Sequence, residues 1–146
     1  MYHMKARSHP FSVRLSPDLD ARITAMAKRT RRSKAAVLQS LADEGERMRR
    51  YPGIVFIGPE ERRQTRVLGT AFDVWKIIDI LQDFDHDVDK VIEAYEPGLS
   101  ARDIELAVAY YHEFTEEIDQ RIARRRRPIE ELRREFPFAE VIEIEG

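Results

Sequence analysis

The chain has 146 residues, of which 42% are hydrophobic, enough for one medium-sized or two small domains. It contains no cysteine, which excludes disulfides and thiolate chemistry, and no apolar run long enough to cross a membrane. The net charge of −2 is unevenly distributed: residues 1–52 hold 12 of the 25 Lys and Arg but 5 of the 27 Asp and Glu. We therefore expect a cytoplasmic protein whose basic part meets a phosphate-bearing partner.

The segment 11–15 has the pattern of a half-buried strand. Apolar and polar side chains alternate along it: Phe11, Ser12, Val13, Arg14 and Leu15. Helical patterns follow, so this strand has no partner nearby in the sequence and its backbone groups must pair elsewhere. We expect it to pair with the same strand of a second copy, forming an antiparallel ribbon whose polar face fits a DNA major groove. Residues 1–9 are expected to form a flexible arm.

Two amphipathic helices are predicted after this strand. The first begins at Ser16-Pro17-Asp18, with Ser16 as the N-cap and Pro17 as the first helical residue. The second begins at Ser33, after the basic turn 29–32. Apolar residues at helical spacing mark the two helices: Leu19, Ile23, Met26 and Ala27, then Val37, Leu38, Leu41, Ala42 and Met48.

This order of strand, helix, Arg-rich turn and Ser-capped helix, over residues 10–51, resembles the ribbon-helix-helix family of dimeric repressors and antitoxins. The resemblance implies that alternate strand side chains read bases and that the start of the second helix holds a phosphate. Pro10 departs from this pattern because it offers no donor to a base. The candidate DNA-binding residues are therefore Ser12, Arg14, Arg31, Arg32, Ser33 and Lys34.

The residue types support the same interpretation. The planar fork of Arg14 can bind guanine O6 and N7, and the helix start at Ser33 presents backbone N–H groups to an anion. Arg31, Arg32 and Lys34 add positive charge around it. The alternative is an ordinary surface arginine on an edge strand and a solvated basic turn.

The second half begins where Tyr51-Pro52-Gly53 stops the second helix. A hairpin is predicted from the apolar run 54–57 and the segment 66–68, and three helical stretches follow. The first two carry apolar faces over 74–81 and 88–95, and the third starts at a Ser100–Asp103 capping box and continues to Ile122. We expect a small trihelical core over residues 53–122 with the single tryptophan, Trp75, at its centre.

Three stretches of this half, 69–74, 99–104 and 107–111, resemble a small prokaryotic antitoxin-like domain family of unknown function. The resemblance covers residues 54–115 and implies a helix-turn-helix-like trihelical fold, often encoded beside PIN-like nucleases. Ala71 stands where the family usually has Arg. Residues 72–120 hold 14 acidic and 3 basic side chains, so this domain is expected to bind protein rather than DNA.

The acidic run at 83–89 has alternate Asp residues, which raises the question of a calcium loop. Counted from Asp85, the carboxylates and Glu96 fit the spacing, but Lys90 stands where the sharp turn requires Gly. The simpler interpretation is that these Asp residues cap a helix. No catalytic constellation or Gly-rich phosphate loop is present, so we expect no metal, no cofactor and no enzyme activity.

Residues 123–146 form a basic helix end and an amphipathic tail. Pro128 breaks the helix after the run 124–127, and the segment 138–145 mixes apolar and acidic residues like a strand that needs an edge. It could pair back on the hairpin at 54–57, or add to a partner while an arginine enters the acidic site of a nuclease. The candidate partner-binding residues are Arg133, Arg134, Phe136, Phe138, Val141 and Ile144.

The expected fold is mainly α with minor β, a ribbon-helix-helix head followed by a trihelical domain. The function that these patterns favour is the DNA-binding antitoxin of a type II toxin–antitoxin pair. Such a homodimer represses its own operator and neutralises a PIN-like ribonuclease toxin. The alternative is a stand-alone dimeric transcriptional regulator whose acidic domain oligomerises or senses a ligand.

Overall fold

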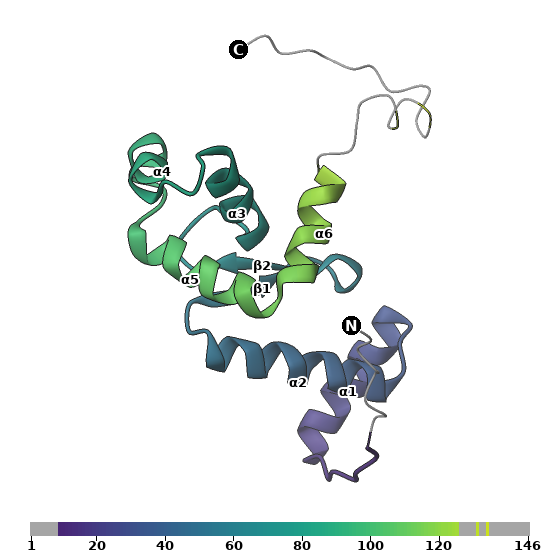
Figure 1. Cartoon of the computed structure of the whole chain (residues 1–146). Coiled ribbons are helices and arrows are strands. Elements are labelled where there is room, and N and C mark those ends of the chain that lie inside the picture. The colour runs from purple at the N-terminus through teal and green to yellow at the C-terminus, as the bar shows by residue number, and fades with distance from the viewer. Residues whose placement is uncertain (1–8, 126–130, 132–133, 135–146) are drawn as a thin grey trace. The chain divides into compact units, whose positions relative to one another are not determined.

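The computed structural model describes residues 9–125, 131 and 134. The fold is mainly helical with one two-stranded antiparallel sheet, as the sequence predicts (Figure 1). The chain forms two compact units, Met1–Gly45 and Glu46–Gly146, and the helix α2 contributes residues to both. None of the helices in the described part of the chain has the length and apolar character needed to span a membrane.

The first unit contains helix α1 (Pro17–Thr30) and the first part of α2 (Lys34–Arg50). The predicted helix starts are confirmed. The Ser16 side chain accepts a hydrogen bond from the backbone N–H of Leu19 at 3.3 Å, and Pro17 is the first helical residue. The Ser33 hydroxyl caps α2 in the same way by accepting from the backbone N–H of Ala36 at 3.1 Å.

Residues 9–16 carry no helix or strand, so the strand predicted over 11–15 is absent from the single chain. A strand requires a second strand that accepts and donates its backbone hydrogen bonds, and residues 9–125 supply none for this segment. The ribbon with a second copy stays a prediction.

The second unit opens with a hairpin. Strands β1 (Ile54–Ile57) and β2 (Gln64–Val67) pair antiparallel with Ile54 opposite Val67, and the short 3₁₀ helix η1 (Glu60–Arg62) lies between them. The turn that ends α2 requires Gly53, whose φ of +104° lies in the left-handed region. The hairpin is therefore the predicted one, with its second strand beginning two residues earlier than expected.

Four helices follow the hairpin: α3 (Val74–Asp83), α4 (Val88–Tyr95), α5 (Ala101–Glu113) and α6 (Thr115–Arg125). The predicted continuous third helix is wrong, because it breaks at Phe114. There the Thr115 hydroxyl donates to the carbonyl of Tyr111 at 2.7 Å, which satisfies a carbonyl that a continuous helix would use. The capping box that begins α5 is present, with Ser100 and Asp103 each bonding the other's backbone N–H.

The core of the second unit lies among α3, α5, α6 and the hairpin (Figure 1). Helix α3 is buried on several sides, as its apolar pattern predicts. Trp75 is not at the centre: it is partly exposed and donates its indole N–H to Asp73 at 3.3 Å. Tyr110 of α5 occupies the fully buried position instead, with 0% exposure.

Replacing Gly53 and Gly45 with alanine should change the free energy of unfolding in opposite directions. A Cβ at Gly53 would lie 2.8 Å from the Leu106 side chain and would require a positive φ, so Gly53→Ala should cost about 1–3 kcal/mol. Gly45 lies inside α2 with nothing within 4 Å of a Cβ, so Gly45→Ala should stabilise the protein by about 0.5–1 kcal/mol. Urea unfolding of both variants measures the difference. Equal changes in unfolding free energy for the two variants would contradict the requirement for glycine at position 53.

Candidate functional site

The candidate DNA-binding cations gather at the turn between α1 and α2. Arg31 ends α1 in the left-handed conformation, with φ 56°, and its side chain is exposed. Arg32 is more constrained, because its guanidinium donates to the carbonyl of Ala36 at 3.4 Å and to the hydroxyl of Ser40 at 2.7 Å. Arg32 therefore stabilises the first turns of α2, a role that the sequence did not predict.

The start of α2 has the features of an anion site. Because no helical turn precedes them, the N–H groups of Lys34 and Ala35 have no intrahelical acceptor. The Lys34 ammonium forms an ion pair with Asp20 of α1, in which both side chains are about half exposed. An exposed ion pair of this kind contributes little to stability, so a phosphate can compete for Lys34.

The segment before α1 separates its apolar from its polar side chains. Val13 and Leu15 line a shallow groove with Ala35 and Leu38 of α2, and Asp20 and Lys34 form its rim. The intervening residues Ser12 and Arg14 are exposed and lie outside this lining. Phe11, which the sequence pattern groups with Val13 and Leu15, is exposed and also lies outside this lining.

The first unit has little core of its own. Among residues 9–45, Ile23 and Val37 are the buried side chains. Phe11 is 85% exposed and Val13 is 54% exposed, and Leu19 and Leu41 also reach the surface. A unit of this size usually needs a partner or a cross-link to be stable, and exposed apolar side chains in a contiguous segment mark an interaction surface.

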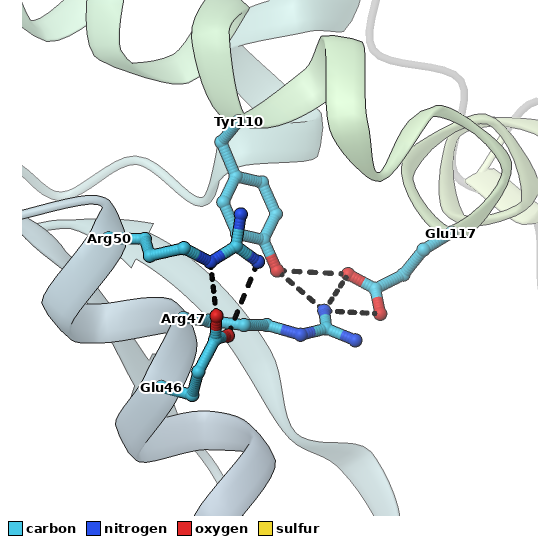
Figure 2. A network of polar contacts seen from close by, with 5 residues as sticks. All are labelled: Glu46, Arg47, Arg50, Tyr110 and Glu117. Carbon is cyan, nitrogen blue, oxygen red and sulfur yellow. Dashed lines mark hydrogen bonds and ion pairs between the residues drawn. The ribbon is translucent and has the colours of Figure 1, made fainter.

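In the second unit, a partly buried polar network joins the last turn of α2 to α5 and α6 (Figure 2). Arg47 donates to the Tyr110 hydroxyl at 2.9 Å and to Glu117 at 3.1 Å, and the Tyr110 hydroxyl donates to Glu117 at 3.2 Å. The Arg47 guanidinium also lies 3.8 Å from the centre of the Phe114 ring. Every member is hydrogen-bonded, so the partly buried charge of Arg47 is compensated by the exposed carboxylate of Glu117.

A second arginine of the same turn, Arg50, forms ion pairs that are more exposed than those of Arg47. Arg50 pairs with Glu46 one turn earlier in α2 and with Glu113 at the end of α5. The hydrogen bond from Arg50 lowers the pKa of Glu113. No local pattern in the sequence predicts that Arg47 and Arg50 attach the last turn of α2 to α6 and α5.

Burial changes the acidity of the central tyrosine. It raises the pKa of Tyr110 from 10.0 to about 12, opposed by the Arg47 hydrogen bond and supported by the charge of Glu117. Tyr110 is therefore a neutral hydrogen-bonding group at ordinary pH. Its hydroxyl joins Arg47 of α2 to Glu117 of α6.

The acidic run before α4 acts as a helix cap. Asp87 accepts a hydrogen bond from the backbone N–H of Lys90 at 3.1 Å, which confirms the simpler interpretation of this segment. Within residues 9–125, 131 and 134, no three His, Asp or Glu side chains come together as metal ligands.

A polar cleft of the second unit lies along α6 and the hairpin. Among the residues that line it are Phe56, Arg62, Thr65, Ile118, Arg121 and Arg124. Of the candidate partner-binding residues, Arg134 is exposed. The remaining five, Arg133, Phe136, Phe138, Val141 and Ile144, lie outside the described residues.

Comparisons with models of known protein families, with curated proteins and with solved structures find no match for this chain. The arguments for function therefore rest on the residues and their geometry.

The shifted pKa of Tyr110 predicts how stability depends on pH. Unfolded tyrosine ionises near pH 10 and folded Tyr110 near pH 12, so the stabilisation is complete below pH 10 and is lost as pH rises toward 12. Tyr110→Phe should be less stable by about 1 kcal/mol at pH 7, because it loses a buried hydrogen bond. Urea unfolding should show this gap shrinking between pH 10 and 12. A gap that stays constant would contradict the shift.

Proposed function

We propose that this chain is a dimeric DNA-binding protein of the ribbon-helix-helix kind. The observation that carries the proposal is the first unit itself, whose apolar Phe11 and Val13 are exposed beside a core of two buried residues. A second copy that pairs along residues 11–15 would cover these side chains and satisfy the backbone of the segment.

The polar side of such a ribbon would carry Ser12 and Arg14 from each copy. Both side chains are exposed in the single chain, and the basic turn with Arg31 and the start of α2 lie in the same unit. This arrangement supports base contacts from the ribbon and phosphate contacts from the helix start.

More narrowly, we propose an antitoxin that represses its own operator and neutralises a PIN-like ribonuclease. The charge of the second unit supports a protein partner, because residues 72–120 hold 14 acidic and 3 basic side chains and would repel a nucleic acid. Co-purification with the product of the adjacent gene tests this step. A nuclease that binds and loses activity supports the antitoxin. Operator binding without such a partner would favour a stand-alone transcriptional regulator.

Dimer formation can be tested with substitutions at two adjacent residues, Val13 and Ser12, which lie on opposite faces of the proposed ribbon. Val13→Asp should convert the dimer to a monomer, because it places a charge on the apolar side of the ribbon. Ser12→Asp changes the polar side and should leave the dimer intact. Light scattering at micromolar concentration distinguishes these states. A folded wild-type monomer at that concentration would refute the ribbon-helix-helix assignment.

DNA recognition should divide between Arg14 and Lys34. Arg14→Ala should cost about 1–3 kcal/mol per arginine on the DNA upstream of its own coding region and much less on a scrambled duplex. Lys34→Ala should weaken binding to both duplexes alike, since a phosphate carries no sequence information. Arg102→Ala, an exposed cation of α5, is the control and should change neither titration. An Arg14→Ala protein with full operator preference would contradict the proposal.

A further inference from the structure

The polar cleft of the second unit contains an unsatisfied donor. The Nε of Arg121, which lines the cleft, is buried and has no hydrogen-bond acceptor among the residues that the structure describes. Its guanidinium lies 5.0 Å from the ring centre of Trp75, a contact that holds the side chain but accepts no hydrogen bond. A buried donor without an acceptor is costly, so the cleft favours a ligand that brings an anionic oxygen.

The other charges of the cleft leave a cationic excess for such a ligand. Arg62 and Arg124 line it with exposed side chains, in addition to Arg121. The fourth lining arginine, Arg63, donates to the backbone carbonyls of Gly58 and Phe56. Glu61 and Glu116 also line it, whereas the third glutamate, Glu117, is already bonded to Arg47 and Tyr110. Phe56 and Ile118 add apolar surface, so the cleft suits a segment that is both acidic and apolar.

We propose that the cleft binds residues 135–146 of the same chain. This segment has four Glu and no Lys or Arg, and its apolar residues include Phe138, Val141 and Ile144. Arg124, which lines the cleft, precedes the last residue of α6 by one position, so the chain leaves α6 at the cleft. At about 3.3 Å per extended residue, the intervening residues reach any part of it.

Because residues 135–146 are covalently linked to α6, a weak contact is sufficient to keep them in the cleft. A segment joined by a short linker is present at an effective concentration on the order of millimolar, so three arginine contacts can keep the cleft filled. The segment that the sequence predicts to bind a partner is then held by its own chain. A partner must compete with the cleft for it, which makes release of residues 135–146 a control point.

The chain allows a direct test of this contact. Trp75 is its single tryptophan and lies against Arg121, and the chain has no cysteine, so Gly146→Cys can carry an energy acceptor for tryptophan emission. In the full chain, Arg62→Gln with Arg124→Gln should lower the transfer efficiency by about half or more, because each arginine contributes to a tethered, salt-screened contact. Replacing Glu140, Glu143 and Glu145 with Gln should give the same fall.

Arg125→Gln is the matched control, since Arg125 is an exposed cation of the same helix outside the lining. It should leave the transfer efficiency unchanged. A transfer efficiency that is unchanged in both the arginine and the glutamate variants overturns the proposal. So does transfer that occurs only between chains, measured by mixing unlabelled wild-type protein with labelled Trp75→Phe, because the occupant is then a second copy. The assay uses neither DNA nor a partner, so its failure leaves the proposed function untouched.

Discussion

One largely buried guanidinium joins three helices of the second unit. Arg47 enters a site formed by Tyr110, Phe114 and Glu117, in which its charge is hydrogen-bonded on one side and covered by an aromatic ring on another. Removing Tyr110 or Glu117 would take a hydrogen-bond partner from a largely buried cation, which is costly. The site lies where α5 ends and α6 begins, with Tyr110 on α5, Phe114 at the break between the helices and Glu117 on α6.

The first unit has the opposite character. Its helices are well capped, but Ile23 and Val37 alone among residues 9–45 are buried, and its most apolar segment faces solvent. Local signals thus define its elements, whereas residues 9–45 bury few apolar side chains of their own. This contrast is the reason why the proposed function includes a second copy of the chain.

The sequence predicts local structure better than long-range contact here. Capping residues and apolar spacing place α1, α2, α3, α4 and the hairpin, since these signals act within a few residues. The break at Phe114 was missed because the apolar spacing continues through it, although Glu116 and Glu117 form the acidic first turn typical of a new helix. The Arg47 network joins residues about seventy positions apart, and no local pattern reports such a pairing. For the same reason, no local pattern predicts that Arg32 bonds Ser40 or that Lys34 pairs with Asp20.

The left-handed backbone at Arg31 has a consequence for how this position can vary. That conformation costs a residue with a Cβ about 1–2 kcal/mol, whereas glycine adopts it at almost no cost. Glycine would therefore be the better residue for the helix end, yet it would remove a cation from the basic turn. Under the proposed function, stability and nucleic-acid affinity oppose each other at position 31. Arg31 supplies the charge at the expense of conformational ease.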